Sequence, residues 1–542
     1  MTLNAKRWVV GILSILLLAS LLVVAKKEVK RQLPVEEEEP IVATSSEGCV
    51  NCHSQSSPAL VKEWEHSLHS KRGIGCYDCH KAEQGEVDAW MHQGAVISTL
   101  VTPKDCAQCH PREYDEFSTS HHARAGEILA SLDNVLAEKA EGIPGRQYAA
   151  VNGCWQCHGT IVDFVRDEKG EIVREKVTIE NGKLGMAEES APKLDPKTWP
   201  NSGMGRLNPD GSKGSCHSCH SRHDFNSRLA RSPDNCGKCH MGPDHPQIEI
   251  YNESKHGIAF RANESRMNLD KKGSWVLGVD YSAAPTCTTC HMGAYKTPQG
   301  EHVANNHDVG QRISWTLRPE VSKRINQVVY TDGFKEDYTE DKPLPKVGDT
   351  VDTVENDAEN YKMVTKKVPR KVAKIISWQE RRDKMKGACM SCHEKEHTNG
   401  FYEQFDGLVN MYNDKFAIPS QNLMNDMKAD GLLPGSPFTN KVQWTYFELW
   451  HHEGRRARHG ASMMGPDYTH WHGTYEVAKN FYTEFLPEVV EQAEKQGGPE
   501  MEAKYEGKVK TLLEGDEHLW LRGLSQEEMD ALKKQRALRY GE

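Results

Sequence analysis

Cysteine and histidine recur in this chain at one fixed spacing that suits covalent haem attachment. The string Cys-x-x-Cys-His occurs eight times and uses all 16 cysteines. Two thiols at this spacing can form thioether bonds with one porphyrin, and the adjacent imidazole then binds its iron. A single copy would also suit half of a zinc site or a redox dithiol. Eight complete copies with no cysteine left over favour haem and leave none for disulfides.

Each motif contributes two predicted thioether bonds and one predicted proximal iron ligand. The thioether-forming cysteines are Cys49, Cys52, Cys76, Cys79, Cys106, Cys109, Cys154, Cys157, Cys216, Cys219, Cys236, Cys239, Cys287, Cys290, Cys389 and Cys392. The proximal ligands are His53, His80, His110, His158, His220, His240, His291 and His393. The sequence therefore predicts eight covalently bound haem c groups.

Histidines outside the motifs are the candidates for the second ligand of each iron. The chain has 26 histidines, and eight of them belong to the motifs. An electron conduit would bind a second histidine at every iron, whereas an enzyme would leave at least one iron open to substrate. The predicted distal ligands are His69, His92, His122, His223, His256 and His307. His66 competes with His69, and His121 competes with His122.

The composition fits a protein whose core is built largely of cofactors. Apolar residues make up only 37% of the chain, below the roughly 45–50% that is usual for globular domains. The formal net charge is −10, and haem propionates would make the assembled protein more acidic. This balance argues against a nucleic-acid partner and favours small or basic redox partners.

The N-terminus carries an export signal. Lys6 and Arg7 precede an apolar run of 18 residues from Trp8 to Ala25, which is close to the length that spans a bilayer. A signal-peptidase site at Val23–Ala25 is the alternative to a retained membrane anchor. We expect residues 1–27 to be this signal or anchor segment, residues 28–47 to be a charged tether, and the haem-bearing body to be periplasmic or otherwise extracytoplasmic.

Two regions with different patterns follow the tether, and together they predict a mainly α fold with minor β structure. Residues 48–400 contain the eight motifs with little regular structure between them. A small hairpin is expected within 160–186, and mixed loop and strand within 320–375. Residues 401–542 show helical periodicity at 402–416, 442–464, 475–496, 502–521 and 526–539. These long helices predict a C-terminal domain that covers haems and suits an oligomer interface.

Beyond the motifs themselves, four local strings resemble the hydroxylamine oxidoreductase family. They are Cys216-His-Ser-Cys-His-Ser-Arg-His-Asp-Phe225, Cys239-His-Met-Gly-Pro-Asp-His245, Ser254-Lys-His-Gly257 and Pro285-Thr-Cys-Thr-Thr-Cys-His-Met292. The resemblance extends from Cys49 to about Phe485. It implies an octahaem oxidoreductase that acts on small nitrogen compounds.

The same resemblance implies where the reaction takes place. In that family the fourth haem in sequence has an open distal face, and here His158 would be its proximal ligand. Asp244 and His245 match the family's Asp-His pair, which lines the pocket and can relay protons. The alternative is a turn in which His245 binds a structural iron.

The direction of the reaction depends on a tyrosine. Oxidative members of the family form homotrimers in which a tyrosine of one subunit is cross-linked to the reactive haem of the next, and Tyr468 is the candidate here. The alternatives are that Tyr468 is a packed aromatic, or that Asp467 or His470 occupies the corresponding place.

The expected reaction interconverts hydroxylamine with nitric oxide or nitrite, with a cytochrome c or a quinone-linked haem protein as electron partner. A reductive relative that forms ammonia without the cross-link is one alternative. A non-catalytic electron conduit with two histidines on every iron is the other.

Overall fold

The structure is a computed structural model that describes residues 46–126, 149–181, 185–359 and 362–541. The chain divides into two compact units, Met1–Cys76 and Tyr77–Glu542. Helices predominate and the sheets are small, which confirms the predicted mainly α fold. The predicted signal or anchor segment, and all but the last two residues of the predicted tether, lie outside the described residues.

The described part of the first unit consists of short helices around the first motif. They are α2 (Glu47–Ser56), α3 (Pro58–His66) and α4 (Leu68–Lys71). Pro58 suits the first turn of α3, where its missing N–H removes no helical hydrogen bond. The Ser67 hydroxyl caps α4 by accepting from the Ser70 N–H at 3.1 Å. The buried Trp64 indole donates to the Ile74 carbonyl at 3.0 Å.

The other seven motifs lie in a region of short helices separated by loops. These helices are α5 (Cys76–His80), α6 (Pro103–Ala107), α7 (Pro111–Ser118), α9 (Ala149–His158), α10 (Ser227–Arg231), α11 (Pro233–Gly237), α12 (Gln247–Glu253), α13 (Lys255–Ala262), α14 (Cys287–His291) and α15 (Trp378–Cys389), with the 3-10 turns η3 (Cys216–Ser218) and η4 (Glu264–Arg266). Side-chain caps begin several of them: Thr102 accepts from the Lys104 N–H at 3.2 Å, and Thr286 from the Thr289 N–H at 3.3 Å. Helices this short depend on tertiary contacts for stability.

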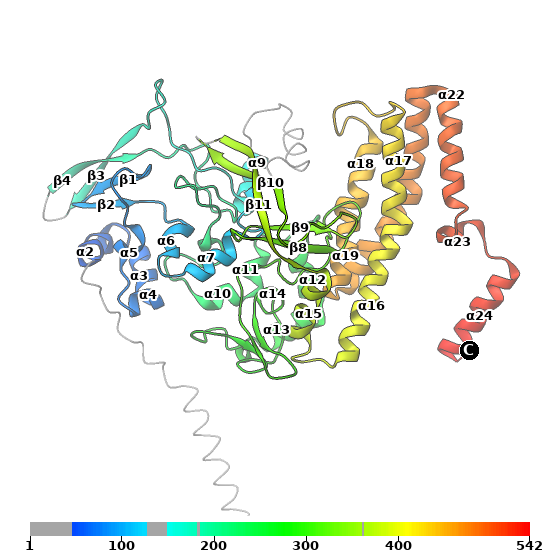
Figure 1. Cartoon of the computed structure of the whole chain (residues 1–542), viewed down its shortest axis with the longest axis horizontal. Coiled ribbons are helices and arrows are strands. Elements are labelled where there is room, and N and C mark those ends of the chain that lie inside the picture. Colours follow the sequence, from blue (N-terminus) through cyan, green and yellow to red (C-terminus); the bar gives the residue numbers. More distant parts are fainter. Residues whose placement is uncertain (1–45, 127–148, 182–184, 360–361, 542) are drawn as a thin grey trace, which may run out of the picture. The chain divides into compact units, whose positions relative to one another are not determined.

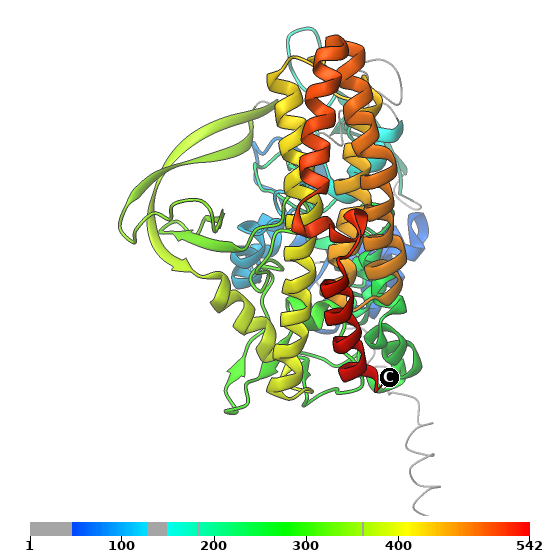
Figure 2. The same cartoon turned by 90° about the vertical axis from the view of Figure 1, so that its right-hand side faces the viewer.

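The strands form small antiparallel sheets and one sheet with a parallel pair. The strands are β1 (Ala89–His92), β2 (Ala95–Ser98), β3 (Arg174–Asn181), β4 (Gly185–Pro192), β5 (Val276–Leu277), β6 (Ala294–Lys296), β7 (His302–Val303), β8 (Ile325–Tyr330), β9 (Lys335–Thr339), β10 (Thr350–Glu359) and β11 (Lys362–Ile376). The sheet orders are β1-β2, β3-β4, β5-β6-β7 and β10-β11-β8-β9, and only β5 and β6 run parallel. Figure 2 shows β10 and β11 as a long bowed ribbon.

The two excursions predicted between motifs contain strands, with one difference in position. The turn expected near residue 168 is present, since the Gly170 N–H donates to the Asp167 carbonyl at 3.0 Å. The main ladder lies further along, in β3 and β4, because the residues before the turn pair only through isolated bridges such as Phe164 with Leu194. Residues 320–375 contain most of the four-stranded sheet.

The last part of the chain is a bundle of long helices interrupted by π-helical turns. Its segments are α16 (Lys395–Tyr412), η5 (Asn413–Ala417), α17 (Ile418–Ala429), α18 (Lys441–Phe447), η6 (Glu448–Glu453), α19 (Gly454–Met463), α20 (Pro466–Thr469), η7 (His470–Tyr475), α21 (Glu476–Asn480), η8 (Phe481–Phe485), α22 (Leu486–Leu513), η9 (Asp516–His518), α23 (Leu519–Arg522) and α24 (Gln526–Tyr540). Figures 1 and 2 show α16, α17, α18 and α22 side by side with their axes nearly aligned.

The predicted helical periodicity is confirmed, and aromatic residues form the core of the bundle. Phe416, Phe481 and Phe485 are buried in one cluster that joins its helices. Two of the π-helical segments, η5 and η8, end two residues before Pro419 and Pro487. A proline lacks the N–H for the usual helical bond and clashes with the carbonyl four residues earlier, so the preceding turn widens.

Arginine side chains attach α19 to the loop before β8. The Arg458 guanidinium is fully buried, donates to the Pro319 carbonyl at 2.8 Å and to the Ser322 hydroxyl at 2.7 Å, and lies 4.3 Å from the centre of the Tyr412 ring. One helical turn earlier, Arg455 Nε donates to the Arg318 carbonyl at 2.8 Å. Removing one partner of such a buried polar network costs about 1–3 kcal/mol or more. The network therefore fixes α19 relative to residues 318–322.

Candidate functional site

Thiols from different motifs lie within hydrogen-bonding distance of one another. The pairs are Cys49 with Cys76, Cys106 with Cys216, Cys157 with Cys239, and Cys236 with Cys287. These contacts join motifs one and two, three and five, four and six, and six and seven. The fold therefore brings together motifs that are up to 110 residues apart in sequence, and motif six contacts two others.

Three motif histidines face a predicted distal histidine across a gap that fits an iron ion. The ring centres are 6.4 Å apart for His80 and His223, 6.1 Å for His240 and His122, and 6.0 Å for His393 and His256. Two imidazoles that bind one metal ion from opposite sides, with metal–nitrogen distances of about 2 Å each, have ring centres roughly 6 Å apart. The residues present therefore fit a haem iron at each of these three places.

Four histidines have an oxygen atom close to Nδ1, which fixes the orientation of the ring. His80 Nδ1 lies 2.8 Å from the Ser98 carbonyl oxygen, and His291 Nδ1 lies 3.3 Å from that of Val309. Two of the predicted distal ligands contact carboxylates instead: the Nδ1–Oε2 distance is 2.7 Å for His92 with Glu189 and 3.4 Å for His307 with Glu116. A partner at Nδ1 leaves Nε2 for a metal and sets the ring orientation.

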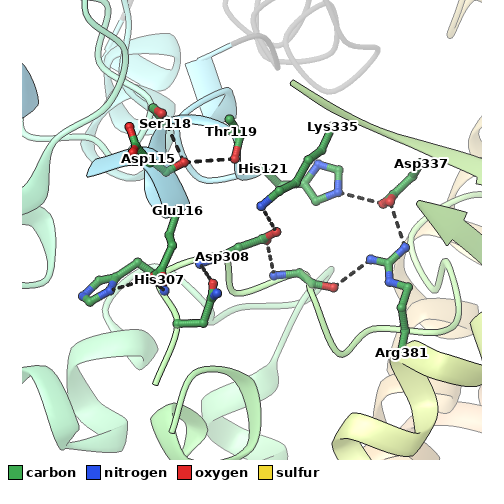
Figure 3. A network of polar contacts seen from close by, with 12 residues as sticks. Asp115, Glu116, Ser118, Thr119, His121, His307, Asp308, Lys335, Asp337 and Arg381 are labelled. Atoms are coloured by element: carbon green, nitrogen blue, oxygen red, sulfur yellow. Dashed lines mark hydrogen bonds and ion pairs between the residues drawn. The ribbon is translucent and has the colours of Figure 1, made fainter. Parts of the chain in front are cut away.

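The structure separates the adjacent histidines at positions 121 and 122. His121 Nε2 lies 2.9 Å from Asp337 Oδ2, and Arg381 holds the same carboxylate at 2.8 Å (Figure 3). The ring of His122 instead faces His240. His122 is thus the better placed of the two for a metal. His66 and His69, the other two competing candidates, differ in burial. His69 in α4 is half-buried, whereas His66 in α3 is exposed.

A tight backbone crossing fixes the fourth motif at the end of α9. The Gly205 N–H donates to the His158 carbonyl at 3.0 Å. A Cβ atom at Gly203 would lie 2.0 Å from the Gly159 nitrogen, so this crossing requires glycine at position 203. Among the described residues no histidine ring lies against His158, in contrast to His80, and the same is true of His291.

Asp244 and His245 form a hydrogen-bonded pair near the fourth motif. His245 Nδ1 lies 2.5 Å from Asp244 Oδ1, and Arg455 Nη1 lies 3.4 Å from Asp244 Oδ2. Burial raises the pKa of the Asp244 carboxyl, but the hydrogen bond from His245 and the charges of His245, His451 and Arg455 outweigh it and hold the pKa well below its usual value. Asp244 is therefore ionised, which favours a proton on His245 Nδ1.

The electrostatic coupling of His245 extends to both neighbouring motifs. Burial is the main cause that lowers the pKa of His158, followed by the charges of Arg318 and His245, while Asp244 opposes them. The ring centre of His245 also lies 6.2 Å from that of His240. His240 thus has two imidazoles at comparable distance, His122 and His245. Both readings of His245, as a pocket residue and as a ligand of the sixth iron, are compatible with this distance.

Sequence reasoning missed the cationic side of this site, which comes from the loop before β8 and from the helical bundle. Arg318 lowers the pKa of His158 and, after burial, is the largest cause acting on the pKa of His122. Burial, and then Arg458 and Arg318, hold the pKa of His459 well below its usual value. The adjacent His451 and His452 at the end of η6 also couple to Asp244. The His-His-Glu-Gly-Arg-Arg string that starts at position 451 was the available signal.

Tyr468 lies in α20 beside α12 and η7. The N–H groups of Asp467 and Tyr468 donate to Glu253 Oε1 at 3.0 and 3.2 Å, and the Tyr468 ring lies 5.6 Å from that of His472. Gly460 allows α19 to approach closely, because a Cβ there would lie 2.6 Å from the Tyr468 carbonyl carbon. The described contacts of Tyr468 within one chain do not include Asp244 or His158.

Family comparisons agree with the chemistry of the motifs. Residues 204–342 match the family described as "Seven times multi-haem cytochrome CxxCH", and residues 105–182 match "Cytochrome c554 and c-prime". The chain is a multihaem c-type cytochrome that carries covalently bound haem c.

One relative has a name that refers to nitrogen chemistry. A probable nitrite reductase-hydroxylamine oxidoreductase fusion protein of Kuenenia stuttgartiensis is 26% identical over 277 residues, which cover 45% of this chain and 25% of that protein. The chain thus spans about a quarter of the length of this relative.

Solved structures share the fold. A hypothetical multiheme protein has a TM-score of 0.64 and 24% identity, and covers 82% of this chain and 95% of its own. The reducing HAO-like protein complex of Kuenenia stuttgartiensis has a TM-score of 0.51 and 17% identity over 86% of this chain and 87% of its own. Together these structures show that the chain has the fold of a multihaem cytochrome.

None of the helices formed by the described residues has the length and apolar character needed to cross a bilayer.

Replacing His122 by alanine should remove the second imidazole from the iron of the sixth motif. We expect one haem to change from low-spin to high-spin, measured by electron paramagnetic resonance and visible absorption, with the haem content unchanged. The matched control is His121→Ala, one residue away, whose ring is held by Asp337 and whose loss should leave the spectrum as it was. An unchanged spectrum for His122→Ala, or equal changes in both variants, would contradict the pairing of His122 with His240.

Proposed function

We propose that this protein is an extracytoplasmic octahaem oxidoreductase that interconverts hydroxylamine with nitric oxide or nitrite at the haem of the fourth motif. The observation that carries the proposal is the hydrogen-bonded Asp244–His245 pair, which is coupled electrostatically to His158, a motif histidine with no ring partner among the described residues. The names of the relatives support nitrogen chemistry of this kind.

All sixteen motif cysteines would hold eight haems in this proposal, and the eight motif histidines would be their proximal ligands. His122, His223 and His256, with ring centres near 6 Å from motif histidines, would be distal ligands of the sixth, second and eighth irons. We propose the same role for His69, His92 and His307. The haem at His158 would keep an open face.

The residues around that face would manage protons and charge. Bound haem would supply the iron that takes the substrate nitrogen and the route by which electrons leave. Oxidation of hydroxylamine to nitric oxide releases three protons with three electrons. His245, whose Nδ1 is held by Asp244, would use its other nitrogen to accept a proton from the substrate. Arg318 and Arg455 make the surroundings cationic, which suits nitrite as the anionic partner of the reaction.

Electrons would pass between neighbouring motifs. Motif four contacts motif six through Cys157 and Cys239, and motif six contacts motif seven through Cys236 and Cys287. Close approach of the attachment points implies close approach of the haems, which favours rapid transfer. We propose a cytochrome c or a quinone-linked haem protein as the external partner, and the acidic net charge suits a basic one.

The assembly and location follow from the resemblance to the family and from the N-terminal sequence. We propose a homotrimer in which the helical region of 401–542 packs against a neighbour. The apolar run at residues 8–25 would export the chain and hold it to the membrane.

Reduction towards ammonia is the second candidate function. A relative named as a nitrite reductase fusion and a fold neighbour named as reducing support it, as does the cationic character that Arg318 and Arg455 give to the pocket. In a reductase the same residues would deliver protons instead of removing them. A conduit with two histidines on every iron would leave the Asp244–His245 pair without a chemical role.

Replacing Asp244 by asparagine should lower the rate of hydroxylamine oxidation by about 10²–10⁴-fold, the usual contribution of a positioned acid–base pair. The amide removes the charge that holds the proton on His245 Nδ1. Turnover is measured with an artificial electron acceptor, and haem content is checked by mass. Asp234→Asn, at an exposed ion pair with Arg261, is the control and should keep wild-type activity. A fully active Asp244→Asn variant would refute the assigned site.

The Tyr468 cross-link can be tested by the intact mass of the denatured protein. Oxidation predicts a covalent trimer in which each chain carries eight haems, and Tyr468→Phe should release monomers of eight haems each. A wild-type protein that is already monomeric when denatured would remove the cross-link and favour the reductive direction.

A further inference from the structure

A buried guanidinium closes the end of the helix that carries motif seven. Arg312 is 2% exposed. Its Nη1 donates to the carbonyl oxygens of Thr289 and Cys290 at 3.2 and 2.9 Å, and its Nη2 donates to that of Gly293 at 2.7 Å. The last carbonyl groups of a helix have no partner within the helix, and a cation is favourable at this end. Arg312 thus caps α14, whose last residue is the motif histidine His291.

The segment that carries Arg312 also contacts the ring of this histidine. His291 Nδ1 lies 3.3 Å from the Val309 carbonyl oxygen, and Val309 precedes Arg312 by three residues. A proton on Nδ1 that is donated to this oxygen leaves Nε2 for the haem iron. Residues 309–312 therefore hold motif seven at two points, the imidazole ring and the end of the helix.

Polar contacts from two other elements hold this segment in place. Lys335 Nζ of β9 lies 2.7 Å from Asp308 Oδ2, and Arg381 Nη2 of α15 donates to the Gly310 carbonyl at 2.7 Å (Figure 3). Asp308 Oδ1 also accepts from the Gly310 N–H at 3.0 Å. The Asp308 and Arg381 side chains are buried. These contacts fix the segment, and with it the position of Arg312 beside motif seven.

The charge of Arg312 is not compensated by a neighbouring acid. Within the described residues, this guanidinium bonds to backbone carbonyls and pairs with no carboxylate. The centre of the Tyr295 ring lies 5.1 Å from its central carbon. Arg381, which is equally buried, instead pairs with Asp337 at 2.8 Å. Because a guanidinium keeps its proton in proteins, motif seven has a buried positive charge next to its iron-binding histidine.

Such a charge acts on the redox equilibrium of a nearby haem. The oxidised iron carries one positive charge more than the reduced iron, so a fixed cation favours the reduced state. Burial and the groups around the axial ligand are two of the factors by which a protein sets a haem potential. A unit charge about 10 Å away, at an effective dielectric constant of about 20, changes an equilibrium constant by roughly tenfold. For a one-electron step this change corresponds to about 59 mV.

We propose that Arg312 raises the reduction potential of the haem of motif seven and makes this haem the electron acceptor for motif six. The effect on the potential requires only a haem at motif seven, whereas the use of this haem as an acceptor rests on the proposed function. Motifs six and seven are in contact through Cys236 and Cys287. One electron at a time leaves the ferrous iron of motif six, which becomes ferric, and reduces the ferric iron of motif seven to ferrous. The external electron partner then reoxidises that iron, and no bond or proton is transferred.

The test is a redox titration of the full-length, haem-loaded protein, followed by visible absorption and electron paramagnetic resonance. Arg312→Gln keeps an amide N–H for the carbonyls but loses the charge. We expect the equilibrium constant for reduction of one haem to fall by roughly tenfold, with the other haems unchanged. Arg312→Lys keeps the charge and should retain most of the wild-type potential. Arg266→Gln, which removes the same charge from an exposed position in η4, is the control and should titrate as wild type.

Haem content is measured by intact mass, so that a shifted potential can be distinguished from a missing haem. An Arg312→Gln variant that holds all its haems and titrates as wild type would overturn the proposal. Equal shifts in Arg312→Gln and Arg312→Lys would assign the effect to hydrogen bonding and overturn the role of the charge. Loss of a haem from both variants would show that Arg312 serves folding alone, and would also overturn it.

The titration also separates this inference from the proposed function. A lowered potential in Arg312→Gln alone would support the role of Arg312 whether or not the protein turns over a substrate. A wild-type protein that turns over neither hydroxylamine nor nitrite would overturn the proposed function and the use of motif seven as acceptor in that reaction, while the shift in potential would still be measured.

Discussion

The packing of the Cys-x-x-Cys-His motifs against one another is the constraint on which the rest of the structure depends. The thiols of motifs four and six are in contact through Cys157 and Cys239, and this contact brings His158 and the segment after His240 to the same place. Asp244 and His245 follow His240 within a few residues, so the acid–base pair is delivered to motif four by the attachment point of motif six. The proposed site, with its proximal ligand, open face, proton acceptor and electron exit, would therefore be built from loops with little regular structure.

The helical bundle adds what those loops lack. Its helices are rigid, and buried arginines such as Arg458 fix α19 to residues 318–322. This arrangement places Arg455 of α19 and His451 of the adjoining η6 near enough to Asp244 to lower its pKa. Positive charge keeps Asp244 ionised, whereas burial among acidic neighbours keeps Glu453 protonated. Asp244 and Glu453 thus have pKa values shifted in opposite directions, and each shift follows from burial and from the groups that surround the carboxyl group.

The sequence predicted the chemistry better than the geometry. The motif residues follow from spacing alone, and His223 was one of the predicted distal ligands. The ring of His223 indeed faces His80. The coupling of His451 and His452 to Asp244 could not be predicted, because helical periodicity in this region indicates packing and the His-His-Glu-Gly-Arg-Arg string does not show what these side chains contact. The hairpin was expected within residues 160–186 across the turn at Asp167–Gly170, whereas the main ladder pairs β3 with β4. Arg318 can be assigned to the site only from the structure, in which the loop before β8 contacts α19.

One measurement tests the central claim most directly, namely that a single iron, at His158, is open to small nitrogen compounds. Electron paramagnetic resonance of the oxidised, haem-loaded protein counts low-spin and high-spin irons before and after nitric oxide, nitrite or hydroxylamine is added. The account predicts one high-spin haem among eight, whose signal alone changes with each compound, and whose response to hydroxylamine is altered in Asp244→Asn. Eight low-spin haems that none of the three compounds perturbs would contradict it, and would make the protein an electron conduit.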